Sequence, residues 1–216
     1  MANSGAFHPS NEPAGLQDGN AISEMRMDIR LEFVTSPPDL PAFETLMRAY
    51  FEIITMMLTD AGGPTYSPEK LAADTVAHLG DLAPSEGRLL LATRDDGALM
   101  GCGAIRRIRP DAAEFKRMFV RPEAQGLGLG RRLFEMRIAE ARSMGCTKLY
   151  ADTVKGNAAM LSMYEKFGFS YVPRYPENAN IPELEPWLVY LRAGISEGGP
   201  PGRGRGIRHT VGRVLE

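Results

Sequence analysis

The segment from 119 to 132 constrains the fold of this chain more than any other. A predicted strand ends at Val120, three glycines follow at alternate positions within 126–130, and a helical pattern begins with Arg131 and Arg132. Glycine lets the backbone turn sharply and approach a ligand without an intervening Cβ. The free N–H groups and the dipole at a helix N-terminus favour an anion. The segment therefore predicts a strand–loop–helix unit that binds a pyrophosphate.

Two familiar phosphate-binding loops do not fit this segment. A P-loop needs Lys-Ser or Lys-Thr after its last glycine, whereas Arg131-Arg132 follows Gly130 here. A Rossmann loop needs a third glycine where Arg131 stands, and it follows the first strand of its fold. Proteins that bind acyl-CoA are the third class of phosphate-binding protein that could contain such a loop.

Hydrophobic periodicity predicts eleven elements in the order β-α-α-β-β-β-α-β-α-β-β. The predicted strands are 29–33, 88–93, 99–108, 114–120, 148–153, 169–172 and 187–192. The predicted helices are 40–58, 68–79, about 130–144 and 157–167, with Ser67 as the N-cap of the second. Antiparallel strands followed by a β-α-β-α-β run indicate an α/β (α+β) domain with a mixed sheet.

The loop and its surroundings resemble the GNAT superfamily of acetyl-CoA-dependent N-acyltransferases. The Q-x-x-G-x-G frame from Gln125 to Gly130 is similar to the central motif of that family, and the element order is the same. Asn157 and Tyr164, the latter in a Tyr-Glu-Lys-Phe-Gly-Phe string, match two further positions on the next helix. Their spacing of two helical turns would put both on one face. Met160 departs from the family, which usually has a small residue there.

The resemblance covers about 28–193 and is closest to bacterial branches that act on small molecules. It implies a mostly antiparallel sheet with helices on both faces. It also implies acetyl-CoA as co-substrate, with no metal. The residues implied to hold it are Met118, Phe119, Val120, Gln125, Gly126, Leu127, Gly128, Leu129, Gly130, Arg131, Asn157 and Tyr164. In this family the strand before the loop diverges from its neighbour, and the backbone N–H of Met118 would then serve as an oxyanion donor.

Two side chains are candidates for proton transfer. Tyr164 matches the usual acid of the family, which protonates the departing thiolate, and a phenol is protonated at neutral pH. Glu114 matches the glutamate base of the histone-acetylating branch. Simple alternation along the strand would put it on one side with Lys116, Met118 and Val120. An ion pair of Glu114 with Lys116 or Arg106, or deprotonation through water, remain alternatives.

The acceptor site is expected between the first helices and the loop before the last strand. Its candidate wall residues are Tyr50, Phe51, Tyr175, Glu177 and Asn178. Three arginines, Arg106, Arg107 and Arg109, either hold an acidic group of the acceptor or form a solvated basic face.

Composition excludes several other classes of protein. The formal net charge is −2, which is unlike a nucleic-acid-binding polycation, and apolar stretches such as Leu89–Ala92 are far too short for a membrane helix. The two cysteines, Cys102 and Cys146, are isolated, and no zinc spacing occurs. Without a secretory signal or a disulfide framework, a cytoplasmic protein is expected.

Three segments are expected along the chain: a disordered leader over 1–27, one acyltransferase domain over 28–193, and a flexible Gly/Arg-rich tail over 194–216. The predicted function is acetyl transfer from acetyl-CoA to a primary amine of a small molecule, directly within a ternary complex. A non-catalytic CoA-binding module and an enzyme that acetylates proteins or peptides are the alternatives. No nucleic acid or membrane partner is expected, and a homodimer is left open.

Overall fold

The computed structural model describes residues 28–195 together with Met1. Apart from Met1, the predicted leader over 1–27 lies outside these residues, as does nearly all of the predicted tail over 194–216. The last strand continues to Gly194, and Ile195 is buried in the core beside it.

The structure contains every predicted helix and strand. The strands are β1 Ile29–Val34, β2 Gly87–Arg94, β3 Leu99–Arg109, β4 Ala112–Val120, β5 Lys148–Val154, β6 Ser170–Val172 and β7 Leu188–Gly194. The α-helices are α1 Leu40–Asp60, α2 Pro68–Ala77, α3 Leu129–Ser143 and α4 Ala158–Lys166. Short 3-10 helices lie at η1 Leu79–Leu82, η2 Pro122–Ala124 and η3 Pro182–Trp187.

The first two helices begin at side-chain caps. The Asp39 carboxylate accepts the backbone N–H of Ala42 at 2.9 Å, and the Ser67 hydroxyl accepts that of Lys70 at 3.2 Å. Each cap satisfies an N–H that has no partner inside its helix, so it fixes where the helix begins. The Ser67 cap was predicted.

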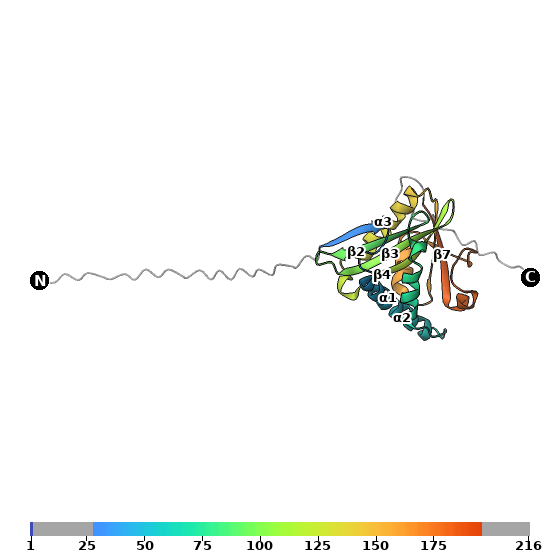
Figure 1. Ribbon diagram of the computed structural model, residues 1–216, viewed down its shortest axis with the longest axis horizontal. Helices are drawn as coiled ribbons and strands as arrows, with labels where there is room; N and C mark the ends of the chain where they lie inside the picture. Colours follow the sequence, from blue (N-terminus) through green and yellow to red (C-terminus); the bar gives the residue numbers. More distant parts are fainter. Residues whose placement is uncertain (2–27, 196–216) are drawn as a thin grey trace, which may run out of the picture.

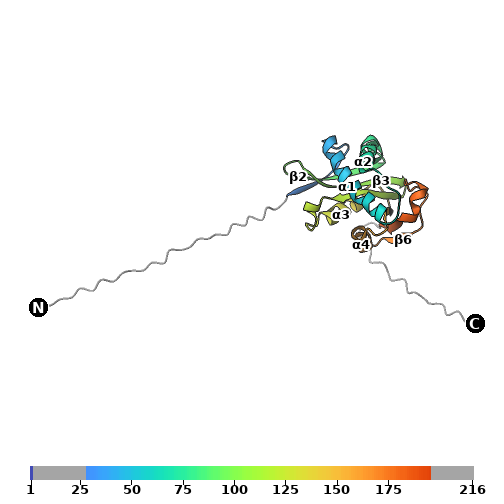
Figure 2. The same ribbon diagram turned by 90° about the horizontal axis from the view of Figure 1, so that it is seen from below.

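The strands form one sheet in the order β1-β2-β3-β4-β5-β7-β6 (Figure 1). Every neighbouring pair is antiparallel except β4 and β5, which are parallel. Helices α1 and α2 cover one face, and α3 and α4 cover the other (Figure 2). The predicted mixed, mostly antiparallel sheet with helices on both faces is confirmed.

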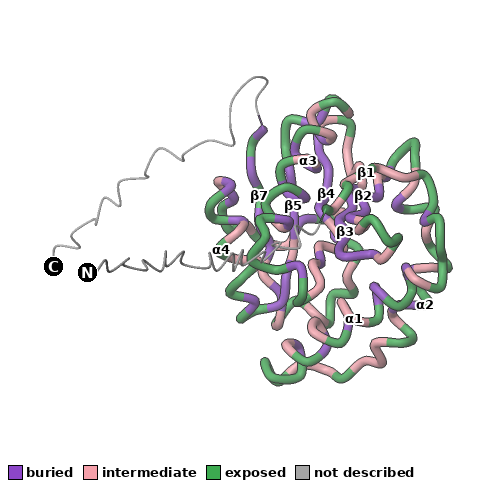
Figure 3. The backbone as a smooth tube through the Cα atoms, turned by 90° about the vertical axis from the view of Figure 1, so that its left-hand side faces the viewer, coloured by how far each residue is buried: buried purple, intermediate pink, exposed green. Residues whose placement is uncertain are grey.

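Two apolar layers enclose the sheet, and the buried segments of the chain gather in the strands (Figure 3). On the α1 face, Phe43, Leu46 and Met47 pack against the sheet with no exposed surface. On the opposite face, Phe134 and Ile138 of α3 pack against the sheet and α4. Close packing on both faces therefore holds the strands of the sheet in place.

The sheet opens between β4 and β5. Their pairing runs from Ala112↔Lys148 only to Phe115↔Ala151. Beyond that point β5 stays paired with β7 through Val154, and β4 stays paired with β3 through Val120. The divergence implied by the family resemblance is thus present.

A β-bulge at Arg117 reverses the alternation of β4. The register with β3 passes from Lys116↔Ala104 to Phe119↔Cys102, so two residues of β4 oppose one of β3. Arg117 has a left-handed φ of 52°, which provides the extra turn of the strand. Phe119 then joins the layer under α1, and Met118 packs instead with the α3 layer. The expectation that Glu114 shares a side with Met118 and Val120 is therefore wrong.

Candidate functional site

The loop between β4 and α3 has a backbone geometry that could hold an anion, and we call it the cradle. Gly126 and Gly128 have φ values of 77° and 74°, a left-handed conformation that glycine adopts without strain. Gly128 is the N-cap of α3 and brings no side chain to its free N–H groups. The Gln125 amide donates to the carbonyl of Val120 at 3.2 Å and closes the loop.

The side chains around this cradle leave its backbone accessible. Leu127 is exposed, Leu129 anchors the helix start in the core, and Arg131 pairs with Glu135 at 2.7 Å on the surface. A Cβ built on Gly126 or Gly128 would meet no atom within 4 Å. An N-terminus of α3 without a capping side chain, next to two arginines, fits the pyrophosphate of a nucleotide.

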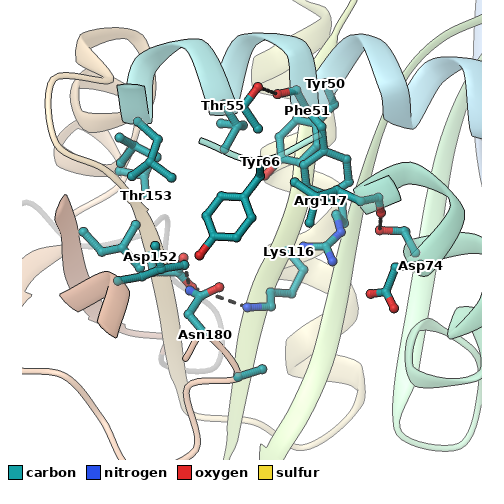
Figure 4. A pocket seen from close by; sticks show the side chains of 18 of the residues that line it. Tyr50, Phe51, Thr55, Tyr66, Asp74, Lys116, Arg117, Asp152, Thr153 and Asn180 are labelled. Atoms are coloured by element: carbon teal, nitrogen blue, oxygen red, sulfur yellow. Dashed lines mark hydrogen bonds and ion pairs between the residues drawn. The ribbon is translucent and has the colours of Figure 1, made fainter. Parts of the chain in front are cut away.

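A pocket of about 550 Å³ lies beneath α1, at the opening between β4 and β5 (Figure 4). Both sides of the opening line it, with Lys116 and Arg117 on β4 and Asp152 and Thr153 on β5. Tyr66, from the connection between α1 and α2, lies across the middle of the cavity in Figure 4. The pocket and the cradle are therefore linked by the few residues of β4 that follow the bulge.

The predicted acceptor wall is only partly correct. Tyr50 and Phe51 line the pocket, as does the first of the three arginines, Arg106. From the loop before β7, the lining residues are Ala179, Asn180, Ile181 and Leu184. The predicted loop residues Tyr175, Glu177 and Asn178 are absent from the lining and bond to other side chains instead.

The three arginines do not form a solvated basic face. Arg106 pairs with Glu114 at 2.9 Å, Arg107 with Glu86 at 3.5 Å, and Arg109 with Glu177 at 3.0 Å. Each arginine side chain is about a quarter to a third exposed. Their charges are thus already compensated within the chain.

Glu114 is fully buried at a junction of four donors. One carboxylate oxygen accepts from Arg106 at 2.9 Å, and the other faces Lys116 at 3.2 Å. That second oxygen also accepts from the Tyr175 hydroxyl at 2.5 Å and from the Asn178 amide at 3.2 Å. Burial and the adjacent carboxylate hold the pKa of Tyr175 well above its usual range, so this hydroxyl remains a donor. The ion pairs considered as an alternative role for Glu114 are present, with its carboxylate fully buried and its two cationic partners partly exposed.

Asp152 of β5 is a carboxylate at the β4–β5 opening that reaches the cavity. It lines the pocket with 15% of its side chain exposed, and it accepts from the amides of Asn178 and Asn180, each at 2.9 Å. Lys116 lies 3.4 Å from it. The sequence motifs did not point to this residue. An acidic side chain inside the otherwise mostly apolar strand 148–154 was the available signal.

Tyr164 lies in the apolar layer between α3 and the sheet. It is 3% exposed, and its ring packs on those of Phe134 and Phe169 at centroid distances of 5.5 and 5.0 Å. Burial raises the pKa of its phenol, and the nearby Arg137 opposes that rise. Its hydroxyl makes no hydrogen bond to any residue within 28–195. It is not among the residues that line the pocket.

Asn157 acts as the N-cap of α4. Its carbonyl oxygen accepts the N–H of Met160 at 3.3 Å, and its amide donates to the Thr153 hydroxyl at 3.0 Å. The residue thereby joins the start of α4 to the β5 wall of the pocket. It precedes the helix, so the expected placement on one helical face with Tyr164 does not hold as stated.

Neither cysteine is among the residues that line the pocket. Cys102 is fully buried under α1, where burial raises the pKa of its thiol to about 12. Cys146 lies just after α3, and burial raises its pKa as well. Within the described part of the chain, no group of three or more metal-ligating side chains occurs. No helix there is long and apolar enough to cross a membrane.

Comparisons with known proteins agree with this geometry. Residues 46–169 match the acetyltransferase (GNAT) family. An uncharacterized N-acetyltransferase of Schizosaccharomyces pombe is 28% identical over 171 residues, which cover 79% of this chain and 97% of that protein. An IAA acetyltransferase of Azospirillum brasilense is 37% identical over 107 residues, or 43% of this chain and 70% of that one.

A solved structure shares the fold at lower sequence identity. Spermidine N-acetyltransferase from Vibrio cholerae, in complex with CoA and spermine, superimposes with a TM-score of 0.54 at 19% identity. The match covers 77% of this chain and 95% of that one. The family match extends over more than half of the sequence and includes both the cradle and the opening between β4 and β5. The chain therefore belongs to the GNAT family and is an acyl-CoA-dependent acetyltransferase.

Proposed function

We propose that this protein transfers the acetyl group of acetyl-CoA to a primary amine of a small molecule, directly within a ternary complex. The observation that carries the proposal is the continuity of β4. This strand runs from the pocket-lining Lys116 and Arg117 to the anion cradle at the start of α3. Donor and acceptor sites thus lie at the two ends of one short segment.

The cradle and the free edge of β4 would hold the co-substrate. The N–H groups at 129–131 point from the N-terminus of α3 and would bind the pyrophosphate, with Arg131 adding charge. Met118, Phe119 and Val120 lie beyond the last pair with β5, so their backbone would be available to the pantetheine arm. The co-substrate would supply the activated acetyl thioester.

The backbone N–H of Met118 remains the proposed oxyanion donor. Met118 has no partner in the pairing of β4 with β3, and it comes after the last residue of β4 that pairs with β5. A donor held by a bulge is fixed before substrate binds, which is the requirement for stabilising charge that develops in the transition state.

We assign the role of base to Asp152 rather than to Glu114. An acceptor ammonium must lose a proton before its nitrogen can attack the thioester carbonyl. Asp152 lines the cavity where the amine would bind, whereas Glu114 has no exposed surface and four donors around it. Asp152 would also attract the ammonium by charge before it takes the proton.

Tyr164 is the proposed acid. When the new N–C bond forms and the C–S bond breaks, the sulfur leaves with the electron pair and needs a proton. The phenol of Tyr164 has a raised pKa and no hydrogen-bond partner within 28–195, so it keeps its proton for that purpose. Cys102 and Cys146 do not line the pocket, which supports direct transfer over an acyl-cysteine.

The proposed small-molecule acceptor rests on the shape of the pocket. A cavity of about 550 Å³ under α1 accommodates a compact ligand. The spermidine acetyltransferase of the same fold acts on a small amine, and we extend that class of acceptor to this chain.

The test compares Asp152→Asn with Asp111→Asn, a surface variant whose carboxylate pairs with Lys148 outside the pocket. Thiol release from acetyl-CoA would be measured with a panel of primary amines. We expect Asp152→Asn to lower kcat/KM by about 10²-fold or more, with a smaller effect at high pH where the amine is already neutral. Full activity of Asp152→Asn at neutral pH would refute the assignment of the base.

A further inference from the structure

Arg117 is the one positively charged side chain of the pocket that lacks an acidic partner among residues 28–195. The pocket's other cations are compensated, because Arg106 pairs with Glu114, and Lys116 pairs with both Glu114 and Asp152. No carboxylate of the described residues is within ion-pair distance of Arg117. A cation in a partly enclosed cavity is stabilised by an anion, and residues 28–195 do not provide one for Arg117.

The backbone and a neighbouring ring hold Arg117 in place. At the bulge, Arg117 has a left-handed φ of 52°, and its side chain lines the cavity beside that of Lys116 (Figure 4). Its guanidinium carbon lies 5.2 Å from the centroid of the Phe51 ring, within the range of a cation–π contact. Its Nε is buried without a hydrogen-bond partner. The guanidinium is therefore oriented in advance and keeps unused donors.

The two other acidic residues of the pocket, Asp74 and Asp81, make no ion pair with Arg117. Asp74 of α2 lines the same pocket, but its carboxylate lies 3.2 Å from His78 on its own helix. Hydrogen bonding to the Asp74 backbone and its carboxylate raise the pKa of His78, which favours the charged pair. The Asp81 side chain of η1 also lines the cavity and makes no ion pair with Arg117.

We propose that the acceptor amine also carries a carboxylate, and that Arg117 binds this carboxylate. The inference rests on the proposed function and specifies its substrate class. A planar guanidinium binds a carboxylate through two parallel hydrogen bonds, which lysine cannot reproduce. Asp152 and Arg117 stand on opposite sides of the β4–β5 opening, so the pocket offers one site for an ammonium and one for a carboxylate. The acceptor is thus an amino acid.

The walls of the pocket specify the side chain of that amino acid. Besides its charged groups, the pocket has apolar and aromatic side chains in its lining: Phe51, Ile54, Leu58, Tyr66, Leu184 and Leu188. An amino acid with an aliphatic or aromatic side chain would remove this surface from water when it binds. Phenylalanine is a suitable probe of the class.

The test uses three amines of similar shape: phenylalanine, phenylalaninamide and phenethylamine. All three have the same ring, but only phenylalanine has a negative charge. Thiol release from acetyl-CoA gives kcat/KM for each amine. The wild-type protein should prefer phenylalanine over both neutral analogues.

Substitution of Arg117 identifies the group responsible for this preference. In Arg117→Met, we expect the ratio of kcat/KM for phenylalanine to that for phenethylamine to fall by about 10²-fold, as is typical for hydrogen bonds to charged groups. Most of the change should appear in KM. Arg117→Lys should give an intermediate ratio, because lysine keeps the positive charge but cannot make the two parallel hydrogen bonds of a guanidinium. Differences in basicity between the amines cancel, because the same amines are compared in every protein.

The matched control is Arg107→Met. Arg107 is also partly buried, donates to the carbonyls of Pro110 and Met144, and does not line the pocket, so its loss should leave the ratio unchanged. Thermal melting confirms that each variant is folded. A wild-type protein that acetylates phenethylamine as well as phenylalanine overturns the inference and leaves the proposed function standing. Failure to bind acetyl-CoA in a calorimetric titration, together with no thiol release from any amine, overturns both.

Discussion

Replacing the carboxylate of Glu114 by an amide separates a structural role of this residue from a catalytic one. In Glu114→Gln, the shape of the side chain is preserved, and Tyr175 and Asn178 can still donate to the amide oxygen. The amide nitrogen, however, replaces the oxygen that lies 2.9 Å from the Arg106 guanidinium, so two donors would face each other. Arg106 then has no carboxylate partner among the described residues.

The expected cost follows from the burial of this cluster. Removing one partner of a buried ion pair typically costs about 3–5 kcal/mol. The loss of stability in Glu114→Gln should be smaller, at about 2–3 kcal/mol, because Arg106 is 26% exposed and Lys116 keeps Asp152 as a partner. For a domain of this size, the melting temperature should fall by about 4–12 °C.

Thermal melting and the pH profile of kcat/KM, measured on the same preparations, decide between the roles. We expect a lower melting temperature in Glu114→Gln, with no change in the shape of the pH profile. Glu140→Gln is the matched control, because Glu140 pairs with Arg88 at 2.8 Å in a partly exposed position, where about 1 kcal/mol or less is expected. Wild-type stability of Glu114→Gln, combined with activity that recovers only at high pH, would refute this reasoning and assign the base to Glu114.

Three further predictions concern the acid, the cradle and the core. Tyr164→Phe should lower kcat by about 10²-fold, with little change in melting temperature or acetyl-CoA affinity. Because burial raises the pKa of Tyr164 above its ordinary value of 10.0, the rate of the wild-type protein should show no loss from ionisation of this phenol below pH 10.0. Gly128→Val should weaken CoA binding at least tenfold in a calorimetric titration, or about 1.4 kcal/mol. The control is Gly97→Val, which is equally strained at a φ of 87° in a hairpin and should leave CoA affinity unchanged. Equal losses of CoA affinity in the two variants would contradict the cradle. Gly103→Ala should destabilise the fold by about 1–3 kcal/mol in denaturant titration, because its Cβ would lie 2.8 Å from the buried Arg137; an unchanged midpoint would show that Arg137 can move aside.

The buried Arg137 is also part of the support for the site. Its guanidinium lies 4.1 Å from the centroid of the Phe115 ring and 3.1 Å from the Met118 sulfur, with no exposed surface. Burial lowers its pKa to about 10, so it remains charged at neutral pH. It thus contacts Phe115 and Met118, on either side of the bulge in the β4 segment that the proposed mechanism uses.

Local sequence was sufficient to predict the helices and strands and the backbone conformation of the glycine loop. Hydrophobic period, the Ser67 cap and the turn glycines depend on neighbours within a few residues, and these predictions are confirmed within about two residues at most ends. The glycines at 126 and 128 do adopt left-handed conformations. A family motif that lies within one loop and one helix can be recognised without knowledge of the remaining fold.

Tertiary structure alone decided which side chains meet in the pocket. The bulge at Arg117 arises from the register between β4 and β3, and a single extra residue reverses every later side chain of the strand. Glu114 became a buried partner rather than an exposed base because Tyr175 and Asn178, some sixty residues later in the chain, close over it. Asp152 reaches the cavity because β4 and β5 part just before it. Sequence periodicity records which face a residue prefers, but contacts between distant strands and loops determine what that face encloses.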